Sequence, residues 1–274
     1  MSTDTKEPPG AGRRTMRTHG GLIIPIADWK LLVRNIDLGR HTLVTGPTGS
    51  GKTSFVIEAA QSRGRVVEVF HFSCIFDAEA TVTGTTQLRG GETHFVRSRF
   101  IDAVTTPRCV IVADEINRAT GAAHNALMSL LDWQGRIAVD TDDGERRLVK
   151  CAPGVVVLAT ANIGAEYVQT EPLDAALLNR MLIIRLDFPE DEEELLRSRG
   201  LTALAAGWLV RVASETRKAY DRGDLPGTVS TRSLLEAADL VRDGFAVEAA
   251  FEAVVPIFDP PGLTKLRTIV RAVK

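Results

Sequence analysis

The chain has 274 residues, of which 44% are hydrophobic and 25% charged, and its formal net charge is -2. This composition is that of a globular protein large enough for one big core, or for a core and a smaller second domain. The nearly balanced charge argues against a protein whose main task is to coat nucleic acid or an anionic membrane, and no apolar run is long enough to span a bilayer.

The first 21 residues, MSTDTKEPPGAGRRTMRTHGG, form a polar segment with charges, prolines and glycines. The segment lacks the apolar stretch that a secretory signal needs. We therefore expect residues 1–21 to be a disordered tail.

From residue 22 to residue 188, short apolar runs alternate with helical segments. Runs that are apolar on both faces suit the central strands of a parallel sheet that helices cover on both sides. Repetition of strand, helix and strand predicts right-handed crossovers and a doubly wound α/β domain. The expected strands are residues 41–46, 65–73, 109–114, 154–162 and 181–188.

After residue 188 the strands stop and helical spacing takes over. The acidic run EDEEELLRSRG suits the positive end of a helix dipole. STRSLLEAADLVRDG reads as a helix with Ser230 or Thr231 as its N-cap and Gly244 near its end. Further helices are expected in AVEAAFEAVVPIF and after DPPG, so residues 189–274 are predicted to form a small all-helical domain.

The segment GPTGSGKT follows an apolar strand and precedes a helical segment, so it matches G-x-x-x-x-G-K-[ST] in the required context. Its glycines let several backbone N–H groups face one anion, and the helix N-terminus adds the positive end of its dipole. Lys52 is expected to reach the β- and γ-phosphates, and the Thr53 hydroxyl to ligate Mg²⁺. The nucleotide-binding residues predicted from this motif are Gly46, Pro47, Thr48, Gly49, Ser50, Gly51, Lys52, Thr53 and Ser54.

The segment VIVADE, residues 110–115, places two carboxylates at the end of a buried strand. Asp114 is expected to hold Mg²⁺ through water, and Glu115 to polarise a water for in-line attack on the γ-phosphate. A strand followed by Asp-Glu is a weak signal by itself. Together with the phosphate loop upstream, it predicts a site that hydrolyses a nucleotide.

With these motifs the chain resembles the AAA+ ATPases and, within them, the MoxR group, with a pattern most similar to the CbbQ/NirQ-type members. The resemblance is carried by GPTGSGKT, VIVADEINRA, ATAN, PLDAALLNR and VSTRSLL, in the family's order from Gly46 to about Leu235. It implies an AAA+ core over residues 22–188 and a helical lid over residues 189–274. It also implies ATP and Mg²⁺ as ligands, although guanine-specific relatives share the general plan.

The resemblance assigns three further roles to this sequence. Asn162 matches sensor 1, a polar side chain that helps to orient the attacking water. Arg232 matches sensor 2, an arginine that reaches the γ-phosphate from the lid; the alternative is a solvent-exposed arginine in the first turn of a helix. Ser73 occupies the place where relatives often keep a polar residue that restrains the catalytic glutamate.

Arg180 follows the short helical stretch LDAALLN and precedes an apolar run. It matches the family's arginine finger, which implies that it points across a subunit boundary into a neighbour's site within a ring, by resemblance a homohexamer. An arginine suits this role because it is always charged and its fork can hold γ-phosphate oxygens in two directions. The alternative is a structural ion pair with Asp174 or Glu171.

Two segments are typical of β-hairpins. Residues 83–98 would turn at Gly90-Gly91, and residues 135–154 would turn about DDG. They lie where MoxR relatives insert hairpins that project from the ring and touch substrates or partners. The alternative is that both are simple surface hairpins.

Functions of different classes fit these observations. The leading hypothesis is an ATP-driven chaperone that remodels a protein client, for which the resemblance implies a partner with a von Willebrand factor A domain. The alternative is a nucleic-acid motor or a nuclease-system subunit, but acids offset the basic residues of the hairpins. The combination of Glu115, Asn162 and Arg180 argues against a scaffold that barely hydrolyses.

The three cysteines, Cys74, Cys109 and Cys151, contain no CxxC pair, which fits reduced thiols in a cytoplasmic protein. His71 and Cys74 have the spacing of a metal pair, but no second pair accompanies them. We interpret them as residues at the end of a strand.

Overall fold

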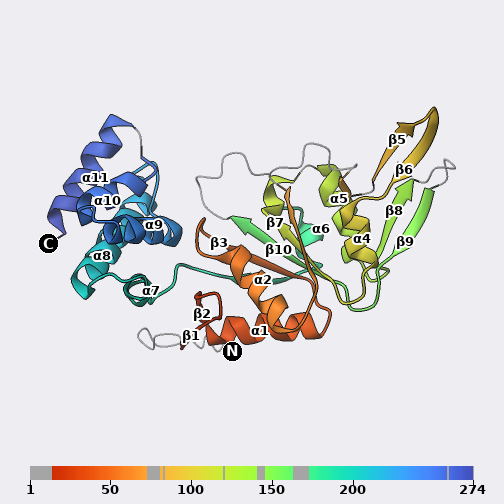
Figure 1. Ribbon diagram of the computed structural model, residues 1–274, viewed down its shortest axis with the longest axis horizontal. Coiled ribbons are helices and arrows are strands. Elements are labelled where there is room, and N and C mark those ends of the chain that lie inside the picture. Colours follow the sequence, from red (N-terminus) through yellow and green to blue (C-terminus); the bar gives the residue numbers. More distant parts are fainter. Residues whose placement is uncertain are drawn as a thin grey trace, which may run out of the picture.

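The computed structural model describes residues 14–72, 81–82, 84–119, 121–140, 146–162, 173–257 and 259–273. These residues form an α/β domain and, after a short linker, a helical domain (Figure 1). The parallel sheet and the helical C-terminal region confirm the fold class predicted from the sequence.

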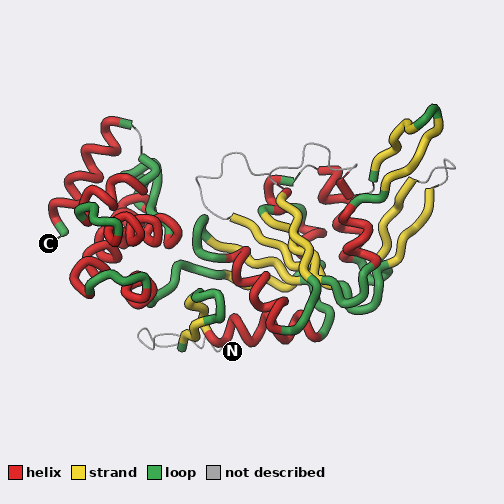
Figure 2. Tube along the Cα trace, in the orientation of Figure 1, coloured by secondary structure: helices red, strands yellow, loops and turns green. Residues whose placement is uncertain are grey.

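A five-stranded parallel sheet is the centre of the α/β domain, and Figure 2 shows its strands in yellow. All five strands fall within the apolar runs that predicted them. The residues of β7 and β10 are all buried, as expected for central strands that are covered on both faces. In spatial order the strands are β11 (Leu182–Arg185), β3 (Thr42–Gly46), β10 (Val156–Asn162), β7 (Val110–Asp114) and β4 (Val67–His71).

Helices cover both faces of the sheet because successive side chains of a strand point to opposite faces. Val110 and Val112 of β7 pack with the first two helices, whereas Ile111 and Ala113 pack with the next two. The two pairs of helices are α1 (Ile26–Asp37) with α2 (Lys52–Ser62), and α4 (Arg99–Thr105) with α5 (Gly121–Leu131). Two shorter elements are the 3-10 helix η2 (Ile116–Arg118), which follows β7, and α6 (Ala175–Leu178), which precedes β11.

The structure contains both predicted hairpins, at the end of the α/β domain remote from the helical domain (Figure 1). The first pairs β5 (Thr85–Arg89) with β6 (Glu92–Val96) and turns at Gly90-Gly91, as predicted. The second pairs β8 (Arg136–Asp140) with β9 (Arg146–Lys150). Its expected turn about DDG lies outside the described residues.

A third hairpin corrects the expectation of a disordered tail for residues 14–21, whereas residues 1–13 lie outside the described residues. The strand β1 (Thr15–Arg17) pairs antiparallel with β2 (Ile23–Pro25). The Thr15 hydroxyl donates to Asp191 at 2.7 Å, and the Arg17 guanidinium donates to the Ser198 hydroxyl at 2.5 Å. Order at this end therefore comes partly from contacts with residues far along the chain.

The helical domain has its own apolar core, in which the rings of Trp208 and Phe251 meet edge to face at 5.9 Å. Its helices are α7 (Glu192–Ser198), α8 (Ala203–Asp221), α9 (Thr231–Arg242), α10 (Val247–Val254) and α11 (Pro260–Ala272). Ser230 is the N-cap of α9, where its hydroxyl accepts the Ser233 N–H at 3.1 Å. In the part of the chain that the structure describes, no helix combines the length and the apolar character needed to cross a membrane.

Candidate active site

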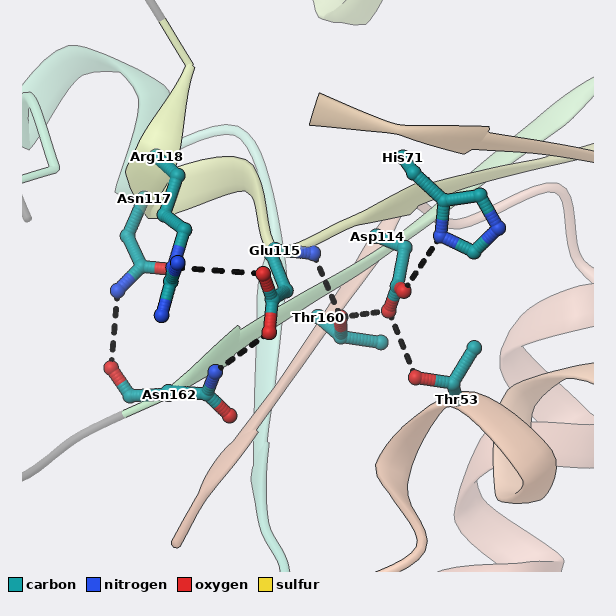
Figure 3. A network of polar contacts seen from close by, with 8 residues as sticks. All are labelled: Thr53, His71, Asp114, Glu115, Asn117, Arg118, Thr160 and Asn162. Atoms are coloured by element: carbon teal, nitrogen blue, oxygen red, sulfur yellow. Dashed lines mark hydrogen bonds and ion pairs between the residues drawn. The ribbon is translucent and has the colours of Figure 1, made fainter. Parts of the chain in front are cut away.

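The candidate site lies at the carboxyl ends of the parallel strands. The register pairs His71 with Asp114 and Ala159 with Ala113, so Thr160 lies beside Asp114. Asn162, two residues further, is level with Gly46, where the phosphate loop begins. The sheet thus brings together side chains from three strands that are far apart in the sequence (Figure 3).

A cleft of about 270 Å³ opens over these strand ends. The phosphate loop, the ends of β4, β7 and β10, and Arg232 of the helical domain line it. Of the nine predicted nucleotide-binding residues, Thr48, Gly49, Gly51, Lys52, Thr53 and Ser54 line the cleft, whereas Gly46, Pro47 and Ser50 do not.

At two positions of the phosphate loop a neighbouring segment lies so close to the backbone that no side chain fits, so only glycine can stand there. A Cβ on Gly46 would lie 1.9 Å from the carbonyl oxygen of Leu186, which follows the end of β11. The backbone after β11 can therefore pass this position only if the residue is glycine. Gly49 has a left-handed φ of +72°, and a Cβ there would lie 2.6 Å from both Cβ and Oγ of Ser230. The phosphate loop is therefore in direct contact with the start of α9.

Lys52 is the first residue of α2 and is only 6% exposed. Its ammonium donates to the carbonyl oxygens of Gly46 at 3.1 Å and Pro47 at 2.7 Å. Burial lowers the pKa of Lys52 to about 8, although the carboxylates of Asp114 and Glu115 oppose the shift. Few water molecules can therefore reach the Lys52 ammonium. A bound polyphosphate would stabilise its protonated form.

Asp114 is held by three side chains. Its Oδ1 accepts the hydroxyls of Thr53 and Thr160, each at 2.6 Å, and its Oδ2 lies 3.0 Å from Nδ1 of His71 (Figure 3). Burial by itself would raise the pKa of Asp114, but the hydrogen bonds from Thr160, Thr53 and His71 outweigh it and keep this pKa below its ordinary value. Asp114 is therefore a carboxylate at neutral pH.

Glu115 has the uncommon left-handed backbone of φ +52°. Its N–H donates to the Thr160 hydroxyl at 3.0 Å, which helps to hold this conformation. Its carboxylate accepts the Asn162 amide N–H at 3.0 Å and lies 3.3 Å from Nε of Arg118 (Figure 3). Asn117 fixes the other side of the pair by donating to the Asn162 carbonyl at 2.9 Å. A carboxylate aimed into the cleft beside an amide can orient and deprotonate a water.

The donor atoms at the cleft fit Mg²⁺. The Thr53 hydroxyl and the Asp114 carboxylate are oxygen ligands, which Mg²⁺ prefers, and they lie within 2.6 Å of each other. Among the described residues no group of three or more His, Cys, Asp or Glu could hold a metal ion by itself. Two protein oxygens, from Thr53 and Asp114, suit an ion whose remaining ligands are water and substrate phosphates.

Arg232 is an exposed side chain in the first turn of α9, and it lines the cleft. Its charge contributes to the lowering of the Lys52 pKa, after the larger effect of burial. The arrangement thus brings a cation of the helical domain to the cleft that the phosphate loop lines, where the resemblance implies an arginine.

Arg180 does not line this cleft. It precedes β11, whose first residue pairs with Thr42, whereas the phosphate loop starts at the opposite end of β3, at Gly46. Four residues of strand separate these levels by roughly 13 Å. The exposed Arg180 side chain donates to the Ala176 carbonyl at 2.8 Å, and Asp174 caps α6 instead of pairing with it. The alternative partner Glu171 lies outside the described residues.

Four members of the polar network were not predicted from the sequence: His71, Asn117, Arg118 and Thr160. Their partners are set by strand register and by the η2 turn, and no local pattern indicates either. His71 was interpreted as a residue at the end of a strand, and it is the last residue of β4, but that interpretation gave it no partner. Cys74 and Ser73 lie outside the described residues, so the expected role of Ser73 stays a prediction.

Comparison with known proteins places these features in context. A model of the AAA domain of the dynein-related subfamily matches residues 41–181, and a model of the CbbQ/NirQ/NorQ C-terminal domain matches residues 192–272. The chain is 34% identical to "Putative chaperone BssE" of Thauera aromatica, over 78% of this chain and 73% of that protein. It is 31% identical to protein NorQ of Paracoccus denitrificans, over 78% of this chain and 77% of that protein.

Among solved structures, the Holliday junction branch migration motor RuvB of Thermotoga maritima superposes with a TM-score of 0.53. It covers 92% of this chain and 72% of its own, at 16% identity. A likeness at that identity supports the fold alone.

Proposed function

The chain belongs to the MoxR-type AAA+ ATPases that carry a CbbQ/NirQ/NorQ C-terminal domain, and on that premise we propose that it hydrolyses ATP in a ring to remodel a protein client. The observation that carries the proposal is the contact between Glu115 and Asn162 at 3.0 Å, next to Asp114 and its threonine partners. It supplies a base and an orienting amide on the cleft that the phosphate loop lines.

In this mechanism each residue acts through the contacts described above. Lys52 exchanges its two carbonyl partners for phosphate oxygens, and the N–H groups at the start of α2 face the same anion. Asn162 orients the attacking water, and Glu115 accepts its proton. Arg232 neutralises the γ-phosphate from the helical domain. Mg²⁺, held by Thr53 and Asp114, would offset the phosphate charge.

Arg180 completes the site in trans. An exposed arginine at the opposite end of β11 and β3 cannot serve its own phosphate loop without a large rearrangement. It is available to a neighbouring subunit in a head-to-tail ring, where an arginine finger contributes roughly 10³- to 10⁵-fold to turnover in other phosphoryl-transfer enzymes. We therefore propose that the ring, a hexamer by family resemblance, is the active form.

The two hairpins are the proposed contact with the client or with a von Willebrand factor A partner. Leu88 on β5 is 75% exposed and Leu148 on β9 is 63% exposed. Large apolar side chains at the outer end of a domain are suited to another protein surface. The naming of BssE as a putative chaperone supports the same class of function.

Substitution of Glu115 by Gln tests the proposal. The amide oxygen can still accept from Asn162, but the base is lost, so ATP should bind while turnover falls roughly 10²- to 10⁴-fold. Glu236→Gln, an exposed carboxylate on α9, is the matched control. The ATP-bound Glu115→Gln protein should also retain a client protein during purification from the source cells.

Two results would contradict the proposal. Near-normal turnover by Glu115→Gln would remove Glu115 from the mechanism. Turnover that DNA stimulates and that salt suppresses would favour the nucleic-acid motor instead.

A further inference from the structure

A buried ion pair lies in the helical domain, close to the linker but outside the cleft. Glu192, the first residue of α7, is 2% exposed, and its carboxylate accepts both Nη atoms of Arg217 of α8, at 2.7 and 2.9 Å. Two-pronged pairing of this kind fixes direction as well as distance. Removing two charges from water costs free energy that offsets much of their attraction, so a buried ion pair adds little net stability. A positioning role is therefore the more informative interpretation of this pair.

The third nitrogen, Nε, and the face of the Arg217 guanidinium are also engaged. Its Nε donates to the Val229 carbonyl at 2.9 Å, and its central carbon lies 3.8 Å from the centre of the Phe188 ring. Phe188 belongs to the linker between β11 and α7. A single side chain thus joins the linker, α7, α8 and the segment that leads into α9.

The same carboxylate holds the start of α9. The Thr231 hydroxyl donates to Oε1 of Glu192 at 2.5 Å, and Thr231 is 6% exposed. Its neighbour Ser230 faces Gly49 of the phosphate loop, and the next residue, Arg232, lines the cleft. The position of Arg232 therefore depends on Thr231, which is hydrogen-bonded to the Glu192–Arg217 pair and through it connected to the linker.

We propose that Glu192, Arg217 and Thr231 are positioning residues, which hold Arg232 at the triphosphate and tie its place to the interdomain linker. The proposal rests on the proposed function, because it takes Arg232 to contact the γ-phosphate. The hydroxyl of Thr231 sets the start of α9, and the stacking of Arg217 on Phe188 transmits the linker position to the same point.

The test uses the ratio of the ADP to the ATP dissociation constant, measured by calorimetry in the Glu115→Gln background so that ATP is not consumed. Arg232→Ala should lower this triphosphate preference about tenfold or more. Thr231→Val removes the hydroxyl but keeps the branched shape, and should lower the preference at least about threefold. Thr231→Ser retains the hydroxyl and should restore most of it.

Two further variants separate positioning from loss of structure. Arg217→Lys keeps the charge and loses the fork, so it should lower the preference in the same direction. Lys218→Met removes an exposed ion pair with Glu215 from the same helix and should leave the preference unchanged. Melting followed by circular dichroism identifies any variant that has lost its fold.

A double-mutant cycle decides whether the effect passes through Arg232. In the Arg232→Ala background, Thr231→Val should change the preference no further. An equal loss in both backgrounds would overturn the inference. An unchanged preference in both Thr231→Val and Arg217→Lys would overturn it while leaving the proposed function intact. No effect of Arg232→Ala would overturn it together with the role of Arg232 in the proposed function.

Discussion

A methyl group on Gly49 should separate the phosphate loop from the helical domain. In Gly49→Ala the new Cβ would lie 2.6 Å from Cβ and Oγ of Ser230 and 3.4 Å from Cβ of Arg232. Ordinary contact between carbon atoms needs roughly 3.5–4 Å, so the start of α9 must move by about 1 Å. Arg232 should then lose the contact with the γ-phosphate that we propose for it.

The size of the effect follows from two contributions. A non-glycine residue in the left-handed region costs roughly 1–2 kcal/mol of folding free energy. Loss of the charged hydrogen bonds of Arg232 costs about 1.5–3 kcal/mol of binding free energy, a ten- to hundredfold loss of ATP affinity. The first contribution lowers stability and the second lowers affinity, so the two can be measured separately.

Gly39→Ala is the matched control. Gly39 has a similar φ of +69°, but nothing lies within 4 Å of its ideal Cβ. Both variants should lose similar stability, by about 2–4 °C in melting temperature per kcal/mol. ATP affinity, measured by calorimetry, should fall only in Gly49→Ala.

A second substitution checks the cause. In Gly49→Ala with Ser230→Gly, both clashing atoms are absent, and glycine is a tolerable N-cap that costs only a few tenths of a kcal/mol. ATP affinity should therefore recover in large part. If the affinity does not recover, its loss arises from strain in the phosphate loop. The contact between the loop and the helical domain then does not contribute to ATP binding.

Two other predictions concern pH and the first hairpin. Burial lowers the pKa of His41 from 6.5 to about 4, so the folded protein binds this proton less well than the unfolded chain does, and stability should fall as pH drops from 6.5 towards 4. The free energy of unfolding in urea should decrease by about 2 kcal/mol between pH 7 and pH 5, and less in His41→Asn; equal decreases would refute the assignment. Replacement of residues 89–92 by a Gly-Ser turn should spare basal ATPase activity and weaken client retention. Loss of ATPase activity with client binding intact would instead make the hairpin part of ring assembly.

Local sequence predicted the parts of the site that are local in the chain. The phosphate loop, from Gly46 to Thr53, and the strand that ends at Asp114 were predicted because strand, turn and helix chemistry lie within a few residues of one another. The turn of the first hairpin at Gly90-Gly91 was predicted for the same reason.

The sequence did not predict contacts that depend on strand order or on long separations. His71 meets Asp114 because β4 lies beside β7, and the sequence does not specify that order. The hydroxyl of Thr231 meets Glu192 across 39 positions. The β1 strand has only three residues, too few for a periodic pattern, and its partners Asp191 and Ser198 follow much later in the chain.

The most direct test of the central claim, that Arg180 acts on a neighbour's nucleotide, is the ATPase activity of mixed rings. Arg180→Ala should bind ATP almost normally, Lys52→Ala should not bind it, and each alone should hydrolyse it poorly. In equimolar mixed rings about a quarter of the interfaces would pair an intact phosphate loop with a neighbour's intact arginine. We expect turnover to rise well above that of either variant. No recovery, in rings shown by mass measurement to contain both variants, would contradict a site shared between subunits.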